Sequence, residues 1–254
     1  MTENIHSIRI LVAGEHGLVI EFGSVIAPEI NLRVQQLARL LHFEPIGGVM
    51  EVIPTYRSVS IYFDPLVITR QELSRQVIHK LGRIEHQGVE DLLSSRVVHV
   101  PVCYGGVLGP DLEYVSRYTG LSPQEVICIH TSKPYMIYML GFIPGFPYLG
   151  GMSSEIAVPR QERPRERIPG GSVGIGGNQT GFYPIESAGE WWLIGRTPIK
   201  AFDLTSDNPF LFSVGDYLHF EEISTAEYFA IRRSVEKGTY VPEVSYLQPR
   251  EKSH

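Results

Sequence analysis

The sequence predicts an α+β protein in which a small N-terminal α+β domain is followed by a mostly-β barrel. Residues 8–84 carry four strand-like runs and two amphipathic helical stretches in the order ββαββα. Residues 135–223 carry short apolar runs separated by Gly and Pro, a texture typical of a closed or nearly closed barrel. A polar, non-periodic segment at 85–95 is the expected linker. We therefore expect an N-terminal domain at 1–90, a barrel domain at 91–240 and a C-terminal tail at 241–254.

The elements of the N-terminal domain follow from hydrophobic periodicity. Residues 8–22 alternate apolar and polar positions around the turn AGEHG, which predicts two strands. The stretch PEINLRVQQLARLLHF predicts a helix, because its apolar residues fall on one stripe. The runs VMEVI and SVSIYF predict two further strands. A second helix is expected to begin at Thr69, where T-R-Q-E forms a capping box.

The second half is predicted to combine short helices with many short strands. Helical segments are expected at 111–118 and 123–129, and the second opens with the capping box S-P-Q-E. The expected strands are YMIYML, IAVP, SVGIG, TGFYPI, EWWLIG and DYLHFEEI. A final helix at 224–237 begins with S-T-A-E and stops at Gly238.

Composition excludes several classes of function. A formal net charge of -6 argues against a nucleic-acid partner, which needs clustered Lys and Arg. The N-terminus MTENIHSIRI lacks a secretory signal, and the longest apolar run is too short and too broken to span a membrane. The two cysteines predict free, mostly buried thiols in a reducing cytoplasm. No histidine pair has metal-ligand spacing, so we expect no metal site.

Two adjoining segments could bind an anion. The first, IPGGSVGIGGNQTG, is rich enough in Gly to turn backbone N–H groups toward a phosphate. It fails the Walker A template because Gly177 stands where Lys is needed, so a tight turn between strands is the alternative. The second, PRQERPRERIP, holds four arginines braced by prolines, a pattern that fits carboxylate or phosphate binding as well as a merely solvated loop.

A small-molecule site is the third candidate. The polar sets Asn178-Gln179-Thr180 and Gly195-Arg196-Thr197 lie at expected strand edges beside aromatic residues. Apolar walls with a few fixed donors are the usual form of such a site. His130 closes a short helix, where a capping or core role competes with a catalytic one. No nucleophile elbow or other autonomous catalytic motif is present.

Dense motifs between residues 97 and 223 resemble one known family. They are VPVCYGG, GPDLEYVSRYTGLSPQEVICIHTS, GFIPGFPYLGG, VPRQERPRERIPGGSVGIGGNQTGFYP, LIGRTP and FSVGDYLHFEEI. The family is that of KipI and allophanate hydrolase subunit 1, which includes the B subunit of bacterial ATP-dependent 5-oxoprolinase, and the chain most resembles that member. Asn178 departs from the Arg common before Gln-Thr in the family, and Glu190-Trp191 replaces the usual Gly-Trp.

The resemblance implies a cyclophilin-like barrel and a function that depends on partners. Family members act beside a barrel subunit of the allophanate hydrolase subunit 2 type, and the oxoprolinase adds a third subunit. Such a complex hydrolyses the lactam 5-oxoproline to L-glutamate and consumes ATP as co-substrate, although the resemblance does not say which subunit holds ATP. One alternative is a non-enzymatic inhibitor that binds a sporulation histidine kinase, as KipI does. Another is part of an allophanate hydrolase or urea carboxylase system.

The expected site residues combine the local pattern with this resemblance. His130 and Arg196 are the catalytic candidates. Substrate or phosphate contacts are expected from Arg160, Arg165, Gln179, Thr180, Tyr183 and Thr197. The uncharged run GFIPGFPYLGG is expected to form a rigid pocket wall or partner surface through Phe142, Pro144, Phe146 and Tyr148.

Overall fold

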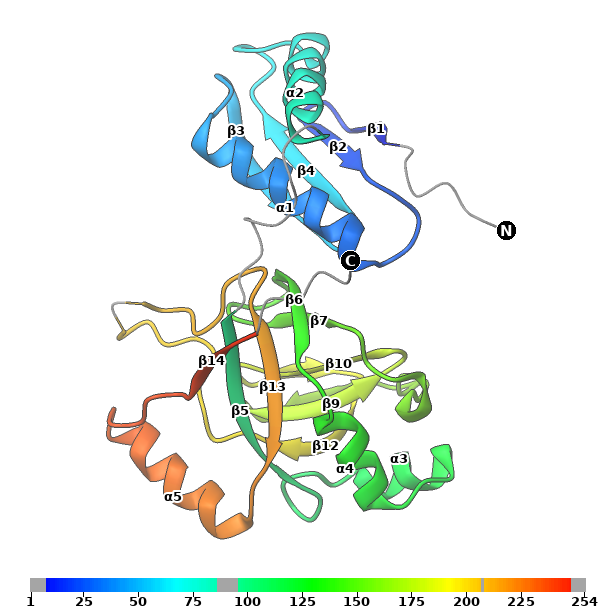
Figure 1. The fold of residues 1–254 in the computed structure, drawn as a ribbon, viewed down its shortest axis with the longest axis vertical. Helices are drawn as coiled ribbons and strands as arrows, with labels where there is room; N and C mark the ends of the chain where they lie inside the picture. Colours follow the sequence, from blue (N-terminus) through cyan, green and yellow to red (C-terminus); the bar gives the residue numbers. More distant parts are fainter. Residues whose placement is uncertain (1–7, 86–95, 207, 248–254) are drawn as a thin grey trace, which may run out of the picture. The chain divides into compact units, whose positions relative to one another are not determined.

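The protein folds into two compact units, one formed by residues 1–93 and the other by residues 94–254 (Figure 1). The computed structural model describes residues 8–85, 96–206 and 208–247. Residues 86–95 of the predicted linker therefore lie outside the described residues. The expected domain boundary at residue 90 lies outside them as well. Each unit has its own apolar core.

The first unit is a four-stranded antiparallel sheet with two helices. Its elements are β1(Arg9–Ala13), β2(Gly17–Glu21), α1(Pro28–Phe43), β3(Val49–Pro54), β4(Ser58–Phe63) and α2(Arg70–Glu85). The strands pair in the order β1-β2-β4-β3. The predicted helical stripes are buried, with Val34 and Leu37 of α1 and Leu73 and Val77 of α2 wholly inaccessible. The predicted ββαββα order is thus confirmed.

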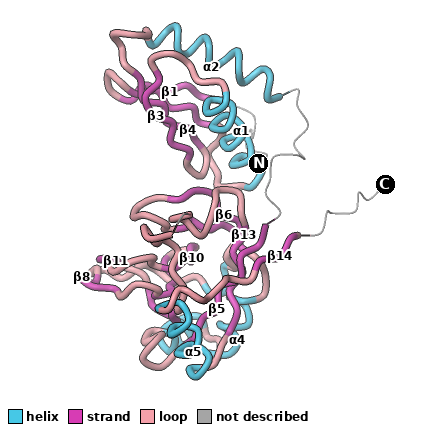
Figure 2. The backbone as a smooth tube through the Cα atoms, turned by 90° about the vertical axis from the view of Figure 1, so that its left-hand side faces the viewer, coloured by secondary structure: helices cyan, strands magenta, loops and turns pink. Residues whose placement is uncertain are grey.

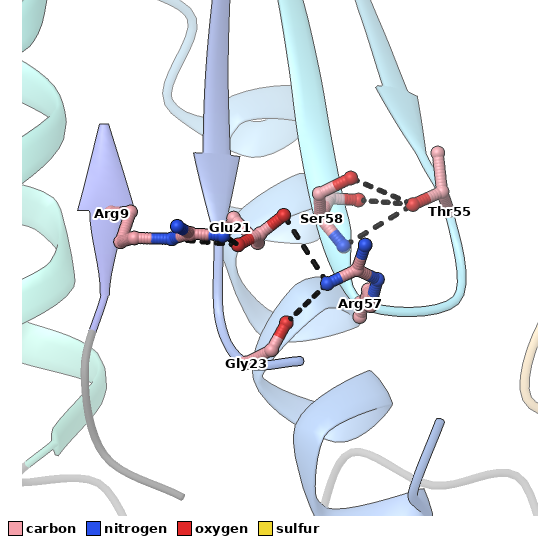
Figure 3. A network of polar contacts seen from close by, with 6 residues as sticks. All are labelled: Arg9, Glu21, Gly23, Thr55, Arg57 and Ser58. Carbon is pink, nitrogen blue, oxygen red and sulfur yellow. Dashed lines mark hydrogen bonds and ion pairs between the residues drawn. The ribbon is translucent and has the colours of Figure 1, made fainter. Parts of the chain in front are cut away.

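A small polar network ties the strand ends of this sheet together (Figure 3). The Glu21 carboxylate at the end of β2 accepts hydrogen bonds from Arg9 of β1 and lies 3.3 Å from Arg57 Nη1. Arg57 also donates to the carbonyl of Gly23 at 2.9 Å. Thr55 and Ser58 close the β3–β4 turn with a hydroxyl–hydroxyl bond of 2.8 Å. These contacts fix the turn without using any residue of the predicted site.

The second unit is built on one long sheet that nearly closes into a barrel (Figures 1 and 2). The sheet runs β10-β9-β12-β5-β13-β6-β7, and its two end strands, β10 and β7, lie beside each other. The strands are β5(Arg96–Tyr104), β6(Tyr135–Leu140), β7(Pro147–Gly150), β9(Ser172–Gly176), β10(Gln179–Phe182), β12(Trp192–Arg196) and β13(Tyr217–Glu222). β5 and β13 run parallel, and the other pairs in the sheet are antiparallel. The predicted α+β class with a nearly closed barrel is confirmed.

Several strands of the structure were not predicted from the sequence, and one predicted strand is wrong. The missed strands are β5, β7, β8(Arg165–Ile168), β11(Ser187–Gly189) and β14(Val244–Tyr246). β5 is buried along most of its length, so its sequence lacks the alternation of a half-exposed strand. β8 lies within the predicted arginine loop, and β14 pairs with β5 from within the predicted tail. IAVP forms a 3₁₀ turn and a single bridge from Val158 to Gly177.

The helices of this unit begin and end within two residues of their predicted bounds. They are α3(Leu112–Thr119), α4(Pro123–Thr131) and α5(Thr225–Glu236). Ser122 and Ser224 form the predicted capping boxes, and Gly238 takes the left-handed conformation after α5.

Cys103 is buried as expected, but Cys128 on α4 is exposed, so the expectation for that thiol is wrong. Among the described residues, no helix combines the length and the apolar character that crossing a membrane requires.

Candidate functional site

A cavity of about 290 Å³ on the barrel unit gathers half of the predicted site. Its walls are largely aromatic, and its polar groups stand at one side. The predicted residues that line it are Phe142, Phe146, Tyr148, Arg160, Gln179 and Tyr183. Pro164, Ala188, Gly189, Glu190 and Trp191 complete the lining. We call this cavity the aromatic pocket.

Phe146 organises the apolar wall of the aromatic pocket. Its ring lies edge-on to Tyr148, Trp191 and Tyr183, with ring centroids 5.1, 5.7 and 5.8 Å apart. Such edge-to-face contacts stabilise an aromatic cluster beyond the apolar area they bury. Phe146 is 3% exposed, whereas Phe142, whose ring lies 5.6 Å from it, is 66% exposed. The wall therefore has a fixed inner part and a projecting outer edge.

The turn that carries the wall has an unusual backbone. Phe142 has φ of 64°, the sole positive φ of a non-glycine residue in the described part of the chain. A bulky residue in that region is strained, and such strain persists at ligand clamps and other functional positions. Gly145, at φ 79°, packs so close to Ala201 and Phe202 that a Cβ would lie 2.9 Å from the Phe202 side chain. This part of the uncharged run GFIPGFPYLGG thus forms a tightly packed turn.

Arg160 supplies the positive charge of the aromatic pocket. Its guanidinium donates to Glu190 Oε1 at 2.6 Å and to Gln179 Oε1 at 2.7 Å. The backbone around Arg160 is anchored as well, since Gln161 N donates to the Glu190 carbonyl and Trp192 Nε1 donates to the Pro159 carbonyl. Anchoring lowers the entropy lost when the guanidinium binds an anion. An oriented cation therefore faces an aromatic wall.

Tyr183 and Gly189 shape the floor of the aromatic pocket. A Cβ on Gly189 would lie 2.3 Å from the Tyr183 hydroxyl oxygen, so a side chain there would displace the ring. Burial raises the pKa of Tyr183 to about 12. Its hydroxyl is thus protonated at neutral pH and can donate a hydrogen bond.

A second concavity of about 300 Å³ holds Arg196 and Thr197. Lys200 and Arg232 also line it, together with the glycine turn Gly170-Gly171 and one carboxylate, Glu236, which accepts from Arg232 Nε at 2.9 Å. The Arg196 Nε atom is buried and has no hydrogen-bond partner among the described residues. Gly171 has φ of 80°, and a Cβ there would lie 2.3 Å from the Thr197 carbonyl oxygen. We call this second site the cationic concavity.

Arg165 and Pro144 line neither site. Both Nη atoms of Arg165 donate to the Asp111 carboxylate at 2.7 Å, which assigns this arginine to an internal ion pair. Pro144 lines a shallow groove with Phe142 and Phe210. Local sequence could not separate Arg160 from Arg165, because Asp111 reaches β8 from a distant part of the chain.

His130 and Thr180 lie together inside the barrel. His130 is wholly buried, and its Nε2 lies 2.7 Å from Thr180 Oγ1 while its Nδ1 lies 2.8 Å from the Tyr104 hydroxyl. Burial lowers the pKa of His130 to about 3. The imidazole is therefore neutral near pH 7, has both nitrogens engaged, and lines neither the aromatic pocket nor the cationic concavity. This geometry supports the core role over proton transfer.

Glu190 and Trp191 are pocket residues that the sequence analysis did not place in the site. Glu190 orients Arg160, and Trp191 is 6% exposed within the aromatic cluster. The signal that could have found Glu190 is its replacement of the Gly that usually precedes Trp in the resembled family. Lys200, four residues after Arg196, was also missed, and so was Arg232, which comes together with Arg196 only in the folded chain.

The barrel, its preceding α+β unit and the clustered motifs define a class of protein. A sequence model of the family described as carboxyltransferase domain, subdomain C and D, matches residues 8–212. The chain belongs to this carboxyltransferase-domain family.

Within that class, the chain is similar over most of its length to proteins named as the B subunit of 5-oxoprolinase. The relative from Bacillus subtilis (strain 168) is 42% identical over 230 residues, covering 86% of this chain and 94% of the relative. The relative from Escherichia coli O157:H7 is 37% identical over 212 residues, covering 84% and 94%. These values confirm the resemblance to the oxoprolinase polypeptide of that name.

A solved structure extends the likeness to the fold. The Kluyveromyces lactis urea carboxylase superposes with a TM-score of 0.77 and 22% identity. The match covers 94% of this chain and 24% of that longer one. At this identity the likeness establishes the fold and carries no function.

Proposed function

We propose that this protein is a subunit of an ATP-dependent 5-oxoprolinase complex. The observation that carries the proposal is the aromatic pocket, where a cation fixed by Gln179 and Glu190 faces apolar rings. The 42% identity to the B subunit of a 5-oxoprolinase, over 94% of that relative's length, supports the same assignment. The complex would be a cytoplasmic hetero-oligomer with an allophanate hydrolase subunit 2-type barrel and a third subunit.

The substrate class fits the composition of the aromatic pocket. 5-Oxoproline is a small ring with apolar methylenes, one lactam and one carboxylate. Its methylenes would lie against Phe146 and Trp191, and its carboxylate would pair with Arg160 in place of Glu190. The Gln179 amide, released from Arg160, could then bond the lactam. Arg160 and Gln179 therefore bind and orient the substrate in this proposal.

The reaction explains why ATP is consumed. A lactam carbonyl is a poor electrophile, and transfer of the γ-phosphoryl group of ATP to its oxygen would activate the carbon. Water would then add to that carbon, and the C–N bond would break with the nitrogen taking a proton, which leaves an acyl phosphate. A second water would hydrolyse this acyl phosphate to L-glutamate and phosphate. Arginines and fixed donors stabilise the charge that develops in such steps. The cationic concavity suits the phosphate, because its three cations, Arg196, Lys200 and Arg232, outnumber its one carboxylate, Glu236.

Reconstitution tests the proposed function. The chain is co-expressed with candidate partner subunits, and phosphate release that depends on 5-oxoproline is measured. We expect release only from the full set, and a full set that neither assembles nor releases phosphate would overturn the proposal. Arg160→Ala should raise KM for 5-oxoproline about 10-fold or more, the loss of a charge-assisted bond. Arg163→Ala, an exposed neighbour outside the pocket lining, is the matched control and should leave KM unchanged.

A non-enzymatic role is the second candidate, favoured by the exposed aromatic edge. Phe142 and Phe210 are 66% and 49% exposed and line one shallow groove, and exposed aromatic side chains anchor protein interfaces. The partner would be the dimerisation domain of a histidine kinase, in line with the resemblance to KipI. Tight binding of that domain, lost in a Phe142→Ser/Phe210→Ser double variant, would support this role. Failure to bind would leave the groove to the subunits of the oxoprolinase complex.

A further inference from the structure

A cluster of two histidines and one glutamate lies on the barrel unit, among the lining residues of neither proposed pocket. His219 and Glu221 are two residues apart on β13, so both side chains point to the same face of the sheet. His99 on β5 is the register partner of His219 in the parallel β5–β13 pair. One potential ligand atom from each residue lies within 4.8 Å of the other two. From this geometry we propose a binding site for a divalent transition metal of the Zn²⁺ class.

The spacing of the ligand atoms suits a small tetrahedral ion. His99 Nδ1 lies 2.6 Å from Glu221 Oε1, and His219 Nδ1 lies 3.9 Å from the same oxygen. Bonds of 2.0–2.1 Å to a tetrahedral Zn²⁺ place neighbouring ligand atoms about 3.3 Å apart. The observed separations bracket that value, so small side-chain rotations would bring the three atoms around one ion. Nitrogen and carboxylate donors in this combination favour Zn²⁺ and its neighbours over Mg²⁺ or Ca²⁺.

Hydrogen bonds already orient both imidazoles for coordination. His219 Nε2 lies 2.9 Å from the Thr131 carbonyl, which can only accept, so in the neutral ring Nδ1 carries the free lone pair. His99 Nε2 lies 2.7 Å from Ser245 Oγ, a hydroxyl that accepts or donates as required. A metal ion bound at His99 Nδ1 would replace the hydrogen bond between that atom and Glu221. The imidazole proton would then lie on Nε2, which would donate a hydrogen bond to Ser245 Oγ. Such outer partners fix the tautomer and ring angle of metal-binding histidines.

The site is reachable and would join separate elements. The side chains of His99 and His219 are 15% and 26% exposed, and that of Glu221 is 42% exposed, which leaves a fourth coordination position for water. The outer partners come from α4, through Thr131, and from β14, through Ser245. Bound metal would thus hold α4 and β14 to the parallel strand pair. Local spacing predicts no site here, because the histidines meet only when β5 and β13 pair.

Metal titration of the full chain tests the proposal. Chelator-treated protein is titrated with Zn²⁺ against an indicator, and Co²⁺ is added separately to read coordination from its visible spectrum. We expect one Zn²⁺ per chain, a Co²⁺ spectrum of a four-coordinate site, and a higher melting temperature with Zn²⁺. His219→Gln and Glu221→Gln should each abolish this stoichiometric binding. His79→Gln, an exposed histidine on α2, is the control and should bind as the parent does.

Ser245→Ala separates ligation from folding, because it keeps all three ligands. Loss of the outer hydrogen bond should weaken Zn²⁺ about 10- to 100-fold while the circular dichroism of the metal-free protein stays unchanged. Absence of Zn²⁺ binding by the parent chain would overturn the proposal. Equal affinity in the parent, His219→Gln and Glu221→Gln proteins would overturn it too, by placing the ion elsewhere. The result is independent of oxoprolinase activity.

Discussion

Arg165 and Asp111 form a two-bonded ion pair in which each Nη atom lies 2.7 Å from its own carboxylate oxygen. The Asp111 side chain is 11% exposed, and its Oδ2 also accepts from the Leu193 backbone N–H at 2.7 Å. One carboxylate therefore joins β8 and β12 to the start of α3. Removing one member would leave the other charge partly buried and unpaired, which is costly.

We expect Arg165→Ala to lower the free energy of unfolding by about 3 kcal/mol. The matched control lies two residues along β8. Arg167 also donates twice to a carboxylate, that of Glu186, but both side chains are more than half exposed. Arg167→Ala should therefore change stability by less than about 1 kcal/mol. Denaturant unfolding of the two variants measures the contrast, and equal losses would contradict it.

His130 should make the stability depend on pH in mildly acidic solution. Burial lowers its folded-state pKa to about 3, against an ordinary value of about 6.5. Between these values the unfolded chain binds the proton and the folded chain does not. The His130 contribution to stability is therefore complete above pH 6.5 and falls by about 1.4 kcal/mol for each pH unit below it.

The comparison between the parent chain and His130→Gln isolates this contribution. Glutamine keeps a donor and an acceptor but does not titrate, so the parent should lose more stability than the variant from pH 7 to pH 5. Unfolding free energies at several pH values measure the difference. Parallel pH profiles for the two proteins would show that His130 is not held neutral in the folded state.

Backbone strain at Phe142 should appear as a difference between two small replacements. At φ of 64° an L-residue is strained and Gly is not. Phe142→Ala and Phe142→Gly both remove the ring, yet we expect the Gly variant to be more stable by about 1 kcal/mol. Thermal or denaturant unfolding tests this order. If Ala is as stable as Gly, the turn relaxes and stores no strain.

The sequence predicts elements well where one face of each is exposed. The strands and helices of the first unit show clear period-two or helical alternation, and their order was predicted correctly. β5 was missed because both of its faces are largely buried, which removes alternation. Short strands such as β7, among Gly and Pro, carry too few residues for a pattern.

The sequence brought together those site candidates that are neighbours along the chain as well as in space. Phe142, Phe146 and Tyr148 share one turn and line one pocket. The distinction between Arg160 and Arg165 needed the long-range contact with Asp111, and Arg232 joins Arg196 only through the fold. The close approach of the Tyr183 hydroxyl to Gly189 likewise could not be predicted from the sequence.

Arg196 provides the decisive test of the cationic concavity. Its side chain lines the concavity, where an incoming phosphate could pair with the guanidinium, while its buried Nε lacks a partner among the described residues. In the reconstituted complex, Arg196→Ala should lower kcat by about 100-fold or more, because a preorganised donor to the transferred group is lost. Assembly, measured by size-exclusion chromatography, should be unchanged. Arg233→Ala, an exposed residue on α5 beside Arg232, is the control and should retain kcat. If the Arg196 variant keeps its fold but loses its partner subunits, Arg196 belongs to the subunit interface, and the phosphate assignment is wrong.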